Sequence, residues 1–129
     1  MTTVIGKPYA YEQLKGVREI RLITLHQCTG SDAISLTINH AYLDEKPTYE
    51  ALSYVWGPQT PSYPIRCNHG TIAVGGSLRD ALQHLRKPDA SRVLWIDRIA
   101  INQKDLDERT QQVNIMGDIY SSASLSLSG

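Results

Sequence analysis

The sequence has few cysteines and no arrangement of them that indicates a metal site. Its 129 residues include only Cys28 and Cys67, which lie far apart and lack the paired spacing of zinc sites and disulfide frameworks. The sequence also lacks the Gly-x-Ser-x-Gly elbow of serine hydrolases and the lysine of a phosphate-binding loop. We therefore expect no metal, no disulfide and a reducing, cytoplasmic location.

An excess of charge of one sign is absent as well. Thirteen basic and thirteen acidic residues cancel, and the basic residues are scattered, which argues against a surface that binds nucleic acid or an anionic membrane. No stretch approaches the ~18 apolar residues of a membrane span, and the N-terminus lacks the apolar core of a signal peptide. We expect a protein that binds neither nucleic acid nor a membrane.

The chain is long enough for one domain with its own hydrophobic core. We expect a single domain over residues 1–129. It would consist of an N-terminal arm (1–17), a β-rich portion (18–76) and a helix-strand-helix-strand portion (77–129).

The β-rich portion begins with two runs of β-branched residues, REIRLITLHQ and ISLTINHAYL, on either side of the turn-forming CTGSDA. This pattern predicts a hairpin or two consecutive strands. TYEALSYVW (48–56) predicts a further strand, and Asn68-His69-Gly70 predicts a second hairpin. The segment GPQTPSYP (57–64) is expected to be irregular, because its three prolines fix φ and remove hydrogen-bond donors.

Two helices are predicted in the second portion. SLRDALQHLRKP (77–88) has apolar residues on one face, Ser77 as a candidate cap and Pro88 as a stop. The second helix, of about four to five turns, begins at the capping pair Asp105 and Glu108 and ends at SSAS. The apolar or small residues that repeat along it at helical spacing are Leu106, Val113, Met116, Tyr120 and Ala123.

The buried-type strand RVLWID separates these helices, and SLSLS predicts one more strand after them. The alternation predicts an α/β fold with antiparallel strands added at its N-terminal end. In open α/β sheets, ligands bind outside the carboxyl ends of the strands. The polar cluster within LWIDRIAINQKDLDER (94–109) would lie at such an edge.

Three blocks of the chain, in this order, resemble the heterokaryon incompatibility (HET) domain of filamentous fungi. They are YEALSYVWG (49–57), LWIDRIAINQKDLDER (94–109) and QVNIMGDIYSSA (112–123). The resemblance implies a flavodoxin-like parallel sheet flanked by helices, similar to that of Toll/interleukin-receptor (TIR) domains. It also implies a role in the cell death that follows fusion of genetically different fungal cells. Some TIR-type domains cleave NAD, so the resemblance makes NAD a candidate substrate and requires no other cofactor.

Cleavage between ribose and nicotinamide passes through an oxocarbenium-like state, which a carboxylate can stabilise. The resemblance implies Glu108 as the catalytic carboxylate, since TIR-type hydrolases use a glutamate on a helix beside the crevice, with Asp97 as second choice. Polar and aromatic side chains would hold the substrate. These candidate binding residues are Tyr54, Trp56, Asn102, Gln103 and Arg109.

Each candidate has a structural alternative. Glu108 has the position of a capping-box residue, and Asp97 could accept backbone N–H bonds or pair with a neighbouring arginine. Asn102 and Gln103 could shape the loop, and Arg109 could be a solvated charge on a helix. Trp56 lies in an apolar run that is typical of a core.

The chain departs from the family pattern at two places. Ala100 replaces a cysteine, and the expected Val-Trp-Leu-Gly-like end of the last strand is absent, as is the C-terminal remainder of the domain. Either the chain is trimmed or it is naturally short, with an exposed edge strand available for self-association or for HET relatives. Three functions stay open: an NAD glycohydrolase, a non-catalytic adaptor or decoy, and a catalyst of another small-molecule reaction.

Overall fold

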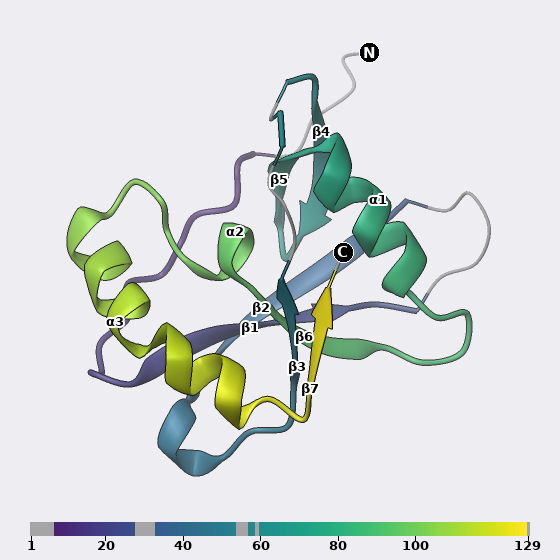
Figure 1. Ribbon diagram of the computed structural model, residues 1–129. Helices are drawn as coiled ribbons and strands as arrows, with labels where there is room; N and C mark the ends of the chain where they lie inside the picture. The colour runs from purple at the N-terminus through teal and green to yellow at the C-terminus, as the bar shows by residue number, and fades with distance from the viewer. Residues whose placement is uncertain (1–6, 28–32, 54–56, 59, 129) are drawn as a thin grey trace.

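The computed structural model describes residues 7–27, 33–53, 57–58 and 60–128. Figure 1 shows a sheet with helices around it. The strands are β1 (Glu19–Leu25), β2 (Ser35–Tyr42), β3 (Glu50–Ser53), β4 (Ser62–Cys67), β5 (Gly70–Gly75), β6 (Arg92–Ile96) and β7 (Leu125–Ser128). The helices are α1 (Gly76–Leu85), α2 (Asp97–Ala100) and α3 (Leu106–Ser122), with a 3₁₀ turn, η1 (Leu43–Glu45).

The described strands form one mixed sheet in the order β5-β4-β2-β1-β6-β3-β7. β1 and β2 pair antiparallel over their whole length, and β4 and β5 form the second predicted hairpin. Asn68 has a positive φ of 54° in the turn of that hairpin, a conformation that Asn tolerates better than most residues. The two strands predicted on either side of CTGSDA thus pair antiparallel, although residues 28–32 between them lie outside the described residues, and the second predicted hairpin is confirmed.

The α/β part of the sheet consists of β6, β3 and β7, and β3 is parallel to both of its neighbours. The prediction of an α/β fold with antiparallel strands at its N-terminal side is therefore confirmed. Because β6 and β7 lie on opposite sides of β3, the chain changes direction along the sheet at β3. This is the kind of switch point at which open α/β sheets bind ligands. The implied likeness to TIR domains stays a prediction.

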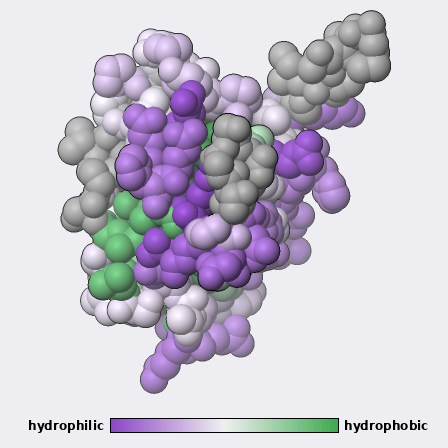
Figure 2. All heavy atoms as spheres, turned by 90° about the vertical axis from the view of Figure 1, so that its right-hand side faces the viewer, coloured by the Kyte–Doolittle hydropathy of each residue, from purple (hydrophilic) through white to green (hydrophobic). Residues whose placement is uncertain are grey.

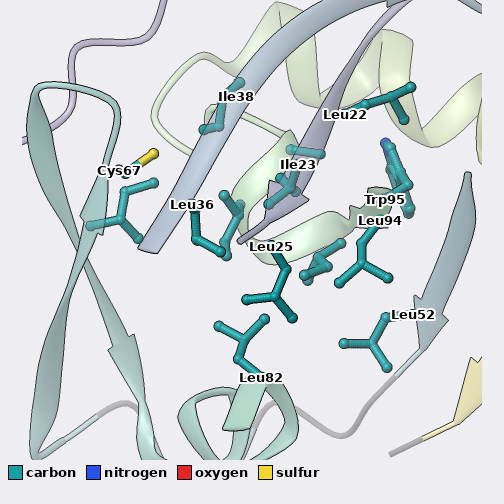
Figure 3. Packing of buried hydrophobic residues seen from close by; sticks show 14 of the residues in the cluster. Leu22, Ile23, Leu25, Leu36, Ile38, Leu52, Cys67, Leu82, Leu94 and Trp95 are labelled. Carbon is teal, nitrogen blue, oxygen red and sulfur yellow. The ribbon is translucent and has the colours of Figure 1, made fainter. Parts of the chain in front are cut away.

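The two long helices cover opposite faces of the sheet. Leu82 of α1 points toward Leu25 and lies on the same side as Leu94 of β6 (Figure 3). Trp95 is the next residue of β6 and therefore points to the other face. There its ring packs edge-on against Tyr120 of α3, with 5.5 Å between the ring centroids. Burial of Leu94, Trp95 and Ile96 at 0% exposure agrees with the prediction from RVLWID.

The structure corrects three details of the sequence interpretation. Ser77 does not cap α1: the N-cap is Gly75, which makes no side-chain cap bond, and Ser77 lies inside the helix. The irregular segment ends before Ser62, because β4 includes Pro64. β2 pairs with β4 only at Arg66 and Cys67, so the missing N–H of Pro64 breaks no bond on that side.

The third correction concerns the face that α3 buries. Leu106 is 69% exposed and Val113 is 59% exposed, although their spacing predicted a shared apolar face. Glu108, Gln112 and Ile119 are the buried residues of the helix. The rest of the predicted face is confirmed, since Met116, Tyr120 and Ala123 pack partly buried against the core. The ion pair that Glu108 forms inside the protein, described below, holds the start of α3 in an orientation that turns Leu106 and Val113 toward solvent.

The N-terminal arm covers one edge of the sheet. The N–H of Tyr9 donates to the carbonyl of Thr71 in β5, and the N–H of Thr71 donates to the carbonyl of Lys7, each at 2.8 Å. The surface seen in Figure 2 is mostly hydrophilic, with a hydrophobic patch at its lower left. No described helix has the length and apolar character to span a membrane.

Two glycine-to-alanine substitutions should have opposite effects. A Cβ at Gly70 would lie 2.5 Å from the carbonyl oxygen of Lys7, so Gly70→Ala should lower the thermal midpoint and release the arm to proteolysis. A Cβ at Gly117 in α3 would meet no atom within 4 Å. Gly117→Ala should therefore stabilise the protein by about 0.5–1 kcal/mol. An arm equally resistant to protease in both variants would contradict the described edge.

Candidate functional site

Asp97 lies where the predicted crevice begins. It follows the last residue of β6 directly and starts α2, while the neighbouring parallel strand β3 ends at Ser53. The carboxyl ends of parallel strands meet at one edge of a sheet, so these two positions belong to the same edge. Tyr54 and Trp56, predicted as substrate-binding residues at this edge, lie outside the described residues.

Tyr120 of α3 joins Asp97 and Ser53 at this edge. Burial raises the pKa of the Tyr120 hydroxyl, the nearby negative charge of Asp97 raises it further, and a side-chain hydrogen bond with Ser53 acts in the opposite direction. The Tyr120 hydroxyl thus lies within hydrogen-bond reach of Ser53 and within electrostatic reach of Asp97, at the carboxyl ends of β3 and β6. Sequence reasoning assigned Tyr120 only to the packing of a helix, because nothing in a linear pattern places it near residue 97.

Glu108 lies in a different environment. Its side chain is 5% exposed and forms a bidentate ion pair with Arg21 of β1, with N–O distances of 2.6 and 2.8 Å. Its Oε2 atom also accepts the backbone N–H of Asn102 at 2.6 Å. At the same time, the backbone N–H of Glu108 donates to the Asp105 side chain at 3.1 Å, as the predicted cap requires. The Asp105 half of the predicted capping box is therefore formed, but the N–H of Asp105 donates to the carbonyl of Asn102 and not to the Glu108 carboxylate, which is bound to Arg21 and Asn102. A catalytic role for Glu108 stays a prediction.

Arg21 is fully buried and holds several segments together. Besides Glu108, its guanidinium donates to the carbonyls of Ala100 and Glu12 at 3.0 and 2.7 Å, and it lies 4.9 Å from the centre of the Tyr11 ring. The sequence interpretation missed Arg21. A signal was present, since an arginine between Ile20 and Leu22 in a strand of apolar residues needs a buried partner.

Asn102 and Gln103 shape the loop between α2 and α3. The side-chain amide of Gln103 donates to the carbonyls of Asp97 and Ile101 at 3.0 and 3.3 Å. The side-chain oxygen of Asn102 accepts the N–H of Lys104 at 3.3 Å. The structure thus shows the bonds of the loop-shaping alternative, and substrate contact by either residue stays a prediction.

Arg109 is exposed on the outer side of α3. It lines a shallow groove with the exposed residues Leu106 and Val113, and its backbone N–H completes the first turn by donating to Asp105. Glu108 and Arg109 are consecutive residues, so their side chains point about 100° apart around the helix: that of Glu108 is buried and that of Arg109 is exposed. The structure therefore does not bring Arg109 and Glu108 together.

A polar cleft of about 330 Å³ lies between the arm and the start of α3. Lys15 and Val17 line one side, and Asp105, Asp107 and Glu108 line the other. Glu108 contributes to this wall, but both of its carboxylate oxygens already accept bonds from Arg21 and Asn102. The acidic side chain that the cleft exposes to solvent is that of Asp107.

The side chains of His26, His40, His84 and Cys67 take part in structural contacts. Nδ1 of His40 lies 2.9 Å from the buried carboxylate of Glu19. Burial raises the pKa of the Cys67 thiol to about 12, so this thiol is neutral and a poor nucleophile at neutral pH. Within the described ranges, no group of three or more histidine, cysteine or acidic side chains could hold a metal ion.

Comparisons with known proteins agree with the resemblance noted in the sequence. The family described as heterokaryon incompatibility protein (HET) matches residues 49–128. Heterokaryon incompatibility protein 6, OR allele, from Neurospora crassa is 40% identical over 118 residues, which cover 81% of this chain and 17% of that protein. The chain thus corresponds to only 17% of the length of this curated relative. No solved structure gives a significant match.

Removing the charge of Glu108 should destabilise the protein strongly. Glu108→Gln leaves the fully buried guanidinium of Arg21 without its counter-charge, and we expect a loss of about 3–5 kcal/mol in the free energy of unfolding. Glu50→Gln is the matched control, because the Arg92–Glu50 pair is also bidentate but partly exposed. It should lose about 1 kcal/mol or less in urea unfolding. Equal losses in the two variants would show that the buried Arg21–Glu108 pair contributes no more to the free energy of unfolding than the partly exposed Arg92–Glu50 pair.

Proposed function

Because the chain belongs to the heterokaryon incompatibility (HET) family, we propose that it acts in the cell-death response that follows fusion of genetically different fungal cells. We further propose that its chemistry is cleavage of NAD between ribose and nicotinamide, at the sheet edge that carries Asp97. The chain corresponds to 17% of the length of its curated relative, so any activity of a whole protein of that length is part of the proposal.

The observation that supports this site is the position of Asp97, directly after the carboxyl end of β6 and next to the end of the parallel strand β3, within electrostatic reach of the Tyr120 hydroxyl of α3. In the proposed reaction, the bond between C1′ of ribose and the nicotinamide nitrogen breaks, and its electron pair goes to the nitrogen. Water then adds to C1′ and releases a proton. A carboxylate next to the ribose stabilises the positive charge that develops at C1′.

The remaining candidates take supporting roles in this proposal. Glu108 anchors the loop through Asn102, and Gln103 holds the carbonyl of Asp97, so together they position the start of α2. Tyr54 and Trp56 stay proposed stacking residues, since they directly follow β3. Arg109 has no part in the proposed reaction because it lies on the outer face of α3.

A second candidate function is non-catalytic association with HET relatives or with a second copy of the chain. β7 is the last strand of the sheet order, and within the described residues only β3 pairs with it. Leu125 on this strand is 52% exposed. An open strand edge with exposed apolar side chains is a typical place for another chain to add a strand.

Nicotinamide release from NAD tests the catalytic proposal. We expect release by the purified protein, and a loss of about 100-fold or more in Asp97→Asn, which removes the charge that stabilises the transition state. Asp107→Asn is the control, because it removes an exposed carboxylate from the same region of the chain. Both variants should keep the thermal midpoint within a few degrees.

The role of Glu108 needs a variant that keeps its stability. Replacing both members of the ion pair, as Arg21→Met with Glu108→Leu, removes the carboxylate without leaving a buried charge. We expect this double variant to release nicotinamide more slowly than the unmodified protein, because the loop loses its bond from Asn102 to Glu108, but faster than Asp97→Asn. If it folds and is inactive while Asp97→Asn is active, Glu108 is the catalytic carboxylate. No release by the unmodified protein at any concentration would contradict the catalytic proposal and favour association.

A further inference from the structure

A groove of about 440 Å³ runs between α1 and the edge strand β7. Leu52 of β3 and Leu127 of β7 form its floor, and these two residues are direct register partners in the parallel pair. Ala81 and Leu85 of α1 form one wall. The groove therefore lies between β3 and β7, where the chain changes direction along the sheet, although no sequence pattern indicated a site there.

The polar groups of the groove lie along its rim. Ser77, Asp80 and His84 are exposed side chains of α1 that follow one another at helical spacing above the apolar floor. The ring Nδ1 of His84 lies 2.9 Å from the carbonyl of Asp80, which fixes the ring against the helix. The carboxylate of Asp80 and the hydroxyl of Ser77 face solvent at the end of the groove where α1 begins.

An apolar floor with polar groups along its rim suits a ligand in which a flat apolar ring is attached to a group that carries hydroxyls. Small-molecule sites are mostly apolar, with a few polar groups that fix orientation, and a volume of this order accommodates a nucleoside. A carboxylate accepts hydrogen bonds from two neighbouring ribose hydroxyls, as acidic residues do in dinucleotide-binding α/β folds.

We propose that the groove between α1 and β7 binds the adenosine part of a dinucleotide, with the base between Leu85 and Leu127 and the ribose at Asp80. This inference rests on the proposed function, because the nicotinamide end of the same substrate would lie at the sheet edge that carries Asp97. The two ends of the ligand then span β3, whose last residues contribute Leu52 to the groove and Ser53 to the reaction site.

Calorimetric titration with AMP tests the groove without any chemistry. We expect AMP to bind, and Asp80→Asn to weaken its Kd by about tenfold through loss of charged hydrogen bonds to ribose. Ala81→Phe fills the groove and should abolish binding. Asp89→Asn, which removes an exposed carboxylate beyond the end of α1, is the control and should leave Kd unchanged. Circular dichroism checks that each variant keeps its fold.

The outcomes separate the two proposals. AMP binding that depends on Asp80 supports the groove even if the protein releases no nicotinamide, in which case only the cleavage proposal fails. Release of nicotinamide with a KM that Asp80→Asn leaves unchanged overturns the groove and leaves cleavage standing. Absence of AMP binding, or equal affinity in Asp80→Asn and Asp89→Asn, also overturns it.

Discussion

The buried ion pair between Arg21 and Glu108 is the interaction on which the arrangement of the other elements depends. Two charges removed from water need near-ideal geometry and additional hydrogen bonds to be tolerated. Here the guanidinium meets both carboxylate oxygens and two backbone carbonyls, and the carboxylate accepts one backbone N–H in addition. Those partners come from the arm, from the end of α2 and from the loop before α3. The buried pair therefore fixes the arm, the end of α2 and the loop relative to β1 and α3.

The same pair explains the environment of Asp97. Glu108 holds the backbone of Asn102, and Gln103 in the same loop holds the carbonyl of Asp97. The start of α2 is thus connected to the buried pair by a short series of hydrogen bonds. On the opposite side, Tyr120 of α3 packs on Trp95 and lies near Asp97. The backbone of Asp97 is thus held by the loop, and α3 lies on the other side of the residue.

Much of the fold could be predicted because its signals are local. The turn at Asn68, the apolar run of β6 and the cap at Asp105 each depend on a few adjacent residues. The site could be predicted only in part. The partner of Glu108 is 87 residues away in the sequence, so a pattern that correctly identified a capping residue could not show an ion pair. The apolar spacing of α3 misled for the same reason, since burial of Glu108 and Gln112 turns Leu106 and Val113 toward solvent.

A double-mutant cycle on Arg21 and Glu108, followed by chemical unfolding, measures how strongly the two buried charges depend on each other. The single variants Arg21→Met and Glu108→Leu should each lose several kcal/mol, while the double variant should recover most of that loss. We predict a coupling free energy of about 3 kcal/mol or more between the two positions, as expected for a buried pair in which each charge depends on the other. A coupling below about 1 kcal/mol, typical of exposed pairs, would contradict the account.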